Sequence, residues 1–136
     1  MLAVTAQLQV RRTAIAEFEV LAAALWQQSH ANEPGLRRYE YIRRADPGSY
    51  LVLMLFDNHE AFITHQASDH HAELAGQMRE LIVSIEVELG DPIDGAFGEP
   101  DGLVRSDQQP VIHPARRTAY ATRYAMPAAI WWRGGT

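Results

Sequence analysis

The sequence predicts an α+β fold of the ferredoxin-like type, in which elements in the order β-α-β-β-α-β form one antiparallel sheet with helices on one face. Two patterns predict this order. Several short runs alternate apolar and polar residues, as strands do, and the segments between them carry apolar residues at helical spacing. The chain has 136 residues, 47% of them hydrophobic and 21% charged, which is typical of a single globular domain with or without an appendage.

The first two predicted elements are a strand and a long helix. In Leu2 to Val10 every second residue is apolar, so these side chains share one face of a strand. From Thr13 to about Ala31 apolar residues recur every three or four positions, which predicts an amphipathic helix. The sequence Asn32-Glu33-Pro34-Gly35 then ends this helix, because proline and glycine both interrupt helical backbone.

A hairpin is predicted next. Leu36 to Arg44 and Ser49 to Phe56 are two runs rich in tyrosine, leucine, valine and isoleucine, residue types that favour strands. The four residues between them, Ala45-Asp46-Pro47-Gly48, supply a fixed proline φ and a permissive glycine, as a tight turn requires. The two strands should therefore pair antiparallel.

Two short helices and a last strand complete the order. Asp57 is expected to cap the first helix, with Glu60 three residues later to complete a capping box. Ser68 is expected to cap the second helix, which runs from Asp69 to about Glu80. In Leu81 to Leu89 the odd-numbered residues are apolar and most even-numbered ones are polar, which predicts a strand with one buried face.

The third predicted strand is apolar on both faces. The residues from Tyr50 to Phe56 include no charged side chain, so the face with Leu51, Leu53 and Leu55 is as apolar as the face with Tyr50, Val52, Met54 and Phe56. An antiparallel sheet with one solvated face would carry polar residues there. We therefore predict an obligate homodimer in which two such sheets close into a dimeric α/β barrel.

The composition changes after Gly90. Residues 91–136 hold five of the seven prolines and five of the nine glycines and show no long periodic run, so we predict a domain over 1–90 and an extension over 91–136. The end of the extension, Tyr120 to Trp132, is aromatic and aliphatic. Such a segment is expected to dock on its own domain or on the partner subunit.

Charge and composition exclude several functions. The net charge is −5, which disfavours a nucleic-acid partner, and all 12 basic residues are arginine, which excludes a Schiff-base or P-loop lysine. The absence of cysteine excludes thiolate chemistry and cysteine-ligated metals. The longest aliphatic run is too short to span a membrane, and no signal peptide is recognised at the start. We expect a cytoplasmic protein with no membrane partner.

Three passages in residues 2–89 resemble the antibiotic biosynthesis monooxygenase family of small dimeric α/β-barrel proteins. They are Glu33 to Glu40, Tyr50 to Asp57, and Ala61 to His70, the last with a family-like pattern of alanine, histidine, a small residue and a second histidine. The resemblance implies a pocket between helices and sheet. In characterised members it implies oxygenation of electron-rich polycyclic phenols without metal, flavin or haem, because the deprotonated substrate itself passes an electron to O₂.

The chain also departs from the family. Many members carry a tryptophan at the end of the third strand, where this chain has Phe56, which keeps an aromatic ring but lacks an indole N–H. The haem-degrading branch uses an asparagine, that tryptophan and a histidine at positions that here hold Thr5, Phe56 and Ala75. We therefore reject haem degradation.

His65 and His70 are the predicted catalytic residues. They are expected at the end of one short helix and the start of the next, beside the open end of the sheet, and a histidine titrates near neutral pH. The alternative is that they only cap helices or complete the core. His59 and His71 lie close by in sequence, but no two of the four histidines are spaced i, i+4, so we predict no metal and no cofactor.

The predicted substrate-binding residues are Phe56, Trp26, Met54 and Thr5. The first three would form an apolar wall for a planar ligand, although such residues are more often plain core. Thr5 would place a hydroxyl in the pocket, or it would bond across the two-fold axis if its face looks into the dimer barrel. Tyr39 and Tyr41 are interpreted as part of an edge strand with a solvated face.

The resulting hypothesis is a cofactor-independent monooxygenase that oxidises a small aromatic molecule, polyketide-like or a quinol, with O₂. His65 or His70 would transfer the proton. The alternative is a non-oxidative isomerase or a small-ligand-binding protein on the same fold, since fold alone does not define the reaction.

Overall fold

The computed structural model describes residues 1–125 and divides the chain into two units, Met1–Ile93 and a second that begins at Asp94. The first unit has the predicted order of elements and is a ferredoxin-like α+β fold, as the sequence indicates. Its elements are β1 (Leu2–Val10), the 3₁₀ helix η1 (Arg12–Ala14), α1 (Ile15–Asn32), β2 (Leu36–Arg43), β3 (Ser49–Phe56), α2 (His59–Ala67), α3 (Asp69–Arg79) and β4 (Ile82–Gly90). None of the helices in residues 1–125 combines the length and the apolar character that crossing a membrane requires.

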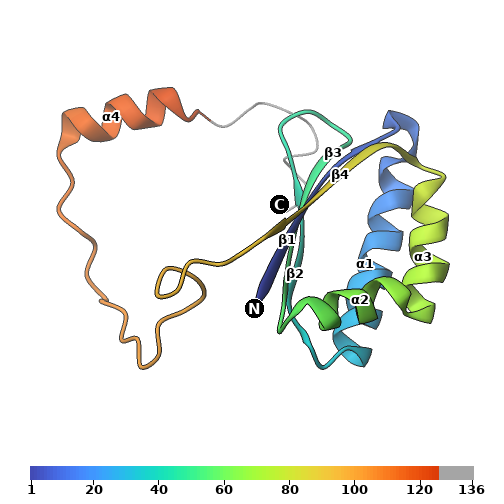
Figure 1. Ribbon diagram of the computed structural model, residues 1–136. Helices are drawn as coiled ribbons and strands as arrows, with labels where there is room; N and C mark the ends of the chain where they lie inside the picture. Colours follow the sequence, from blue (N-terminus) through green and yellow to red (C-terminus); the bar gives the residue numbers. More distant parts are fainter. Residues whose placement is uncertain (126–136) are drawn as a thin grey trace. The chain divides into compact units, whose positions relative to one another are not determined.

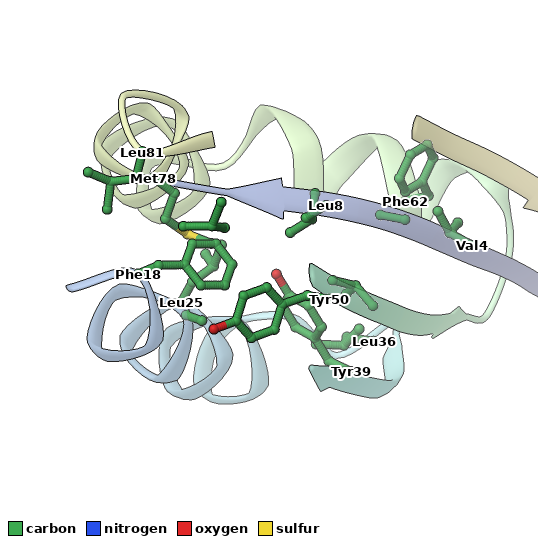
Figure 2. Packing of buried hydrophobic residues seen from close by; sticks show 14 of the residues in the cluster. Val4, Leu8, Phe18, Leu25, Leu36, Tyr39, Tyr50, Phe62, Met78 and Leu81 are labelled. Atoms are coloured by element: carbon green, nitrogen blue, oxygen red, sulfur yellow. The ribbon is translucent and has the colours of Figure 1, made fainter. Parts of the chain in front are cut away.

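The four strands form one antiparallel sheet in the order β2-β3-β1-β4, and the helices α1, α2 and α3 lie on one side of it (Figure 1). Register puts the side chains of Val4, Ala6 and Leu8 on the helix side, beside Tyr50, Val52 and Met54 of β3. These residues pack with Phe18 and Leu25 of α1 and with Met78 and Leu81 at the end of α3 (Figure 2). Burial of this face is the main source of stability for the unit.

Two glycines permit the connections around β2 and β3. Gly48 closes the hairpin with φ of +87°, and a Cβ there would lie 2.6 Å from the carbonyl oxygen of Val10. A Cβ on Gly35 would lie 2.7 Å from the Cβ of Ala61, so glycine lets α2 approach the start of β2 closely. The predicted hairpin turn is confirmed.

The cap of α2 differs from the prediction. Asn58, not Asp57, is the N-cap, because its side-chain oxygen accepts from the Ala61 N–H at 2.8 Å. Asp57 instead accepts a hydrogen bond from Arg37. The prediction for α3 is confirmed, since the Ser68 side chain accepts from the His71 N–H.

The face assignment in β4 also differs. The strand begins at Ile82, and its register against β1 shifts so that Ile82 pairs with Val10 while Ser84 pairs with Gln9. Val83 is the extra residue of a β-bulge and is exposed, so Ile82 and Ile85 lie on the same face. Simple alternation from Leu81 predicts the opposite face for Ile82.

The outer face of the sheet, opposite the helices of the first unit, carries a row of leucines on β3 with polar residues on the neighbouring strands. Leu51 and Leu53 are partly buried although the helices of the first unit all lie on the other side of the sheet. Leu53 pairs with Glu40 on one side and Thr5 on the other, and Thr5 pairs with Glu88 of the edge strand β4. The predicted apolar second face of β3 is therefore present in the first unit.

The second unit contains one helix among its described residues, α4 (Pro114–Arg123). Pro114 occupies its first turn, where a missing N–H costs nothing, and the rings of Tyr120 and Tyr124 stack 6.2 Å apart. The predicted docking segment extends to Trp132, and its part from 126 onward lies outside the described residues. Docking of this segment stays a prediction.

Candidate active site

A cavity of about 270 Å³ lies between the helix side of the sheet and the helices of the first unit. Its walls are mostly apolar, and the polar groups on it come from β2, α2 and α3. Ile85 and Val87 of β4 are about half exposed, so the wall that they form is the one nearest to solvent. The lining residues are Ala6, Leu8, Leu25, Tyr39, Tyr41, Val52, Met54, His65, Gln66, His71, Ala75, Met78, Arg79, Ile82, Ile85 and Val87.

His65 borders this cavity and is held by a buried carboxylate. It lies in the last turn of α2, and its Nδ1 is 2.9 and 3.0 Å from the two carboxylate oxygens of Glu33, the residue that ends α1. The side chains of His65 and Glu33 are 2% and 4% exposed. Because an ionised carboxylate only accepts hydrogen bonds, Nδ1 carries the proton and Nε2 keeps a free lone pair. His65 is therefore oriented as a base.

His70 contacts the same carboxylate from the opposite side. Its Nε2 is 2.5 Å from Oε2 of Glu33, and its side chain is 15% exposed. It does not line the cavity but a separate hollow on the surface between α1 and α3, which Asp69 and Glu73 also line. The structure thus brings the two predicted histidines together through Glu33, a residue that the sequence analysis does not single out.

His71 lines the cavity together with His65. Its ring centroid lies 4.8 Å from that of His65, with the two rings close to perpendicular. Burial lowers the pKa of His71 to about 4. Burial also lowers the pKa of His65, and the bonds to Glu33 oppose this shift only in part. Both rings are therefore neutral near pH 7 and able to accept a proton.

Two tyrosines supply hydroxyl groups to the cavity. The hydroxyl oxygens of Tyr39 and Tyr41 are 2.5 Å apart, and the Tyr39 ring meets His65 edge-on at 5.4 Å. Burial raises the pKa of Tyr41 to about 12 and raises the pKa of Tyr39 further. Both stay protonated as hydrogen-bond donors. The predicted edge strand with a solvated face is confirmed, since β2 is at the edge of the sheet and Arg38 is exposed, while Tyr39 and Tyr41 lie on the inner face.

The four predicted substrate-binding residues occupy different places. Met54 lines the cavity. Phe56 is fully buried behind it, where its ring packs 5.4 Å from His65 and 5.5 Å from Phe62. Trp26 is 43% exposed, and its indole N–H donates to the carbonyl of Tyr39 at 2.6 Å. Thr5 points to the opposite face of the sheet, so it cannot place a hydroxyl in this cavity.

Glu33, His65 and His70 could also hold a metal ion. Their ligand atoms lie within 4.8 Å of one another, and two imidazole nitrogens with one carboxylate suit Zn²⁺. Both histidines already bond the carboxylate of Glu33, at 2.5–3.0 Å. A metal would have to replace the hydrogen bonds of both histidines. The direct bonds satisfy the same polar atoms without an ion.

The comparisons with known proteins find a family model and solved structures that match the first unit. A family model described as antibiotic biosynthesis monooxygenase matches residues 1–77. A proposed antibiotic biosynthesis monooxygenase from Caulobacter crescentus CB15 is 28% identical, with 68% of this chain and 90% of that chain covered and a TM-score of 0.66. The Rv0793 protein from Mycobacterium tuberculosis is 26% identical, with 71% and 98% covered and a TM-score of 0.64.

A third similar structure is a proposed antibiotic biosynthesis monooxygenase from Nitrosomonas europaea. It is 15% identical, with 68% of this chain and 99% of that chain covered and a TM-score of 0.65, and it shows the fold alone. No curated protein matches the sequence. In all three structures the matched part is about two thirds of this chain and nearly the whole of the other chain.

Proposed function

The chain belongs to the antibiotic biosynthesis monooxygenase family, and from this premise we propose that it is a cofactor-independent monooxygenase. Its substrate is an electron-rich aromatic molecule, polyketide-like or a quinol, and its oxidant is O₂. One observation carries the proposal: His65, held at Nδ1 by the buried Glu33, lines a mostly apolar cavity of about 270 Å³. A base in a dry pocket is the chief requirement of this chemistry.

The first step is removal of a proton from the substrate. Nε2 of His65 takes the proton of a phenol or an activated C–H, and the resulting anion passes one electron to O₂. The two radicals combine into a peroxide, which takes up the proton from His65 and loses water. One CH₂ and one O₂ thus become one C=O and one H₂O, with the substrate as the reductant and no external electron source.

The other cavity residues orient the substrate and exclude water. One of the Tyr39 and Tyr41 hydroxyls donates to the other, and the second donates its hydrogen to a substrate oxygen as negative charge develops there. Met54, Leu8 and Val52 form an apolar wall against a planar ring. Phe56 supports His65 from behind and acts on the ring orientation, not on the substrate.

The proposal includes a homodimer in the cytoplasm. Leu51 and Leu53 on the uncovered face of the sheet support pairing of two subunits sheet to sheet, because apolar rows of this kind are expensive to leave in water. Thr5 and Gln7 would then lie at the interface and would contact the second subunit.

The same residues also support a reaction without oxygen. A base in contact with a substrate C–H and one hydroxyl donor from the tyrosine pair for its carbonyl are sufficient for an isomerase that moves a proton within one molecule. A protein that only binds such a ligand would need the cavity alone. These are the alternatives that the following experiment separates.

The test is oxygen uptake by the purified protein with anthrones and naphthols and no added cofactor. We expect uptake that depends on substrate, and a loss of about 100-fold or more in His65→Ala, since general bases typically contribute 10²–10⁴-fold. His59→Ala is the matched control, because His59 is exposed at the start of α2. Absence of uptake with every phenol, together with ligand binding or proton exchange, would support the alternatives instead.

A further inference from the structure

Glu33 lies between two hollows and contacts a histidine on each side. His65 borders the internal cavity, and His70 borders the surface hollow between α1 and α3. The carboxylate joins them through distances of 2.9 Å to Nδ1 of His65 and 2.5 Å to Nε2 of His70. A continuous row of hydrogen-bonding groups therefore runs from the cavity to a surface where solvent is present.

We propose that His65, Glu33 and His70 form a proton-transfer path between the cavity and the surface hollow, with Glu33 and His70 as positioning residues for the base His65. The inference deepens the proposed function, since it concerns the proton that His65 handles. It assigns different tasks to the two histidines: His65 contacts the substrate, and His70 contacts water.

The transfer balances group by group. When Nε2 of His65 takes a proton from the substrate, the Nδ1 proton moves to one oxygen of Glu33. The proton shared between the other oxygen of Glu33 and His70 moves to Nε2 of His70, and the Nδ1 proton of His70 passes to water. At the start one proton lies in the Glu33–His70 contact and one on Nδ1 of His70. One proton leaves the substrate and one enters water, while His65 keeps one proton and the Glu33–His70 pair together keeps two. The reverse sequence supplies the proton that the peroxide needs.

The other neighbours of His65 are poor carriers. Phe56 has no ionisable group, and Tyr39 has a pKa raised by burial, so its hydroxyl holds its proton. His71 faces the cavity, and burial lowers its pKa to about 4. On the outer side, His70 is partly exposed in a hollow that Asp69 and Glu73 also line. Arg79, at the end of α3, is on the cavity side and disfavours a proton there.

The path gives His65 a route for proton exchange with the solvent that does not require water in the cavity. Water in the cavity would quench reactive intermediates and weaken the electrostatic interactions on which the reaction depends. A base with no contact to water, however, can exchange protons only with the substrate. With the side chain of His65 only 2% exposed, exchange through Glu33 and His70 lets the base equilibrate with the solvent without water reaching it from the cavity.

The test measures proton exchange without any substrate. In ¹⁵N-histidine-labelled protein, the exchange rate between water and the Nδ1–H of His65 is measured by saturation transfer. His70→Gln keeps an N–H donor to Glu33 but cannot carry a proton, and we expect exchange at least tenfold slower. The matched control is His59→Gln, which changes an exposed histidine at the start of α2 and should leave the rate unchanged.

A second variant tests the middle of the path. Glu33→Gln retains an oxygen that accepts from Nδ1 of His65 but cannot take up a proton, so the same slowing of tenfold or more is expected. An exchange rate in both variants within a factor of two of the unmodified protein would overturn the proposal, because protons would then enter through the cavity mouth. Failure of oxygen uptake would contradict only the proposed function, since this exchange needs no substrate.

Discussion

Replacement of Glu33 by alanine should destabilise the protein by about 3 kcal/mol. The change removes the acceptor for Nδ1 of His65, whose side chain is 2% exposed, and a buried donor left without a partner costs about 1–3 kcal/mol. His70 also loses its partner, but it can turn to water and contributes less. Removal of the buried CH₂ and carboxylate also leaves a small void, which adds about 1 kcal/mol.

The assay is urea unfolding at pH 7.5, followed by far-UV circular dichroism at one fixed protein concentration. The expected result is a lower midpoint with an unchanged slope, from which the free-energy difference follows. Glu33→Gln, which keeps the acceptor for His65, should lose only about 1 kcal/mol. Glu73→Ala removes an exposed glutamate of α3 and should stay within about 0.5 kcal/mol. A loss below about 1 kcal/mol in Glu33→Ala would refute the role of Glu33 in holding His65.

Two further predictions concern pH and assembly. Because burial lowers the pKa of His65 and His71 below the unfolded value of 6.5, these groups contribute stability above pH 6.5 that is lost as the pH falls towards 4. The urea midpoint should drop over this range and drop less in His71→Gln; a midpoint independent of pH would contradict this. Leu53→Asp should convert a dimer to monomers in sedimentation velocity, whereas Val20→Asp on the exposed surface of α1 should not, and a monomeric unmodified protein would contradict the proposed interface.

The fold could be predicted because its signals are local. Alternation in β1, the apolar run in β3 and the helical spacing in α1 each follow from a few adjacent residues, and the structure agrees with all three. The bulge at Val83 could not be predicted in this way, because it depends on how β4 pairs with β1 and not on the sequence of β4 alone. The cap at Asn58 was missed for a related reason, since Arg37, 20 residues away, binds Asp57.

The candidate site could be predicted only in part. His65 was found because its position at the end of a short helix follows from the local sequence. Its partner Glu33 is 32 residues earlier, in a segment that otherwise indicates only the end of a helix. Thr5 could not be placed, because its position depends on which face of β1 the helices cover. Trp26 could not be placed, because it lies at the margin of a broad apolar stripe on α1. For the tyrosine hydroxyls in the cavity, the one signal available from sequence was the alternation of Tyr39 with charged residues.

The bulge in β4 has a consequence for how the chain tolerates changes in length. Ser84 already pairs with Gln9 and Ile82 with Val10, so loss of Val83 would join them as successive residues of a regular strand. Every cavity-lining side chain of β4 would keep its face. What would change is the local twist, because bulges increase the coiling of an edge strand. A one-codon deletion at this position would therefore alter the curvature of the cavity's outer wall while leaving its chemical composition the same.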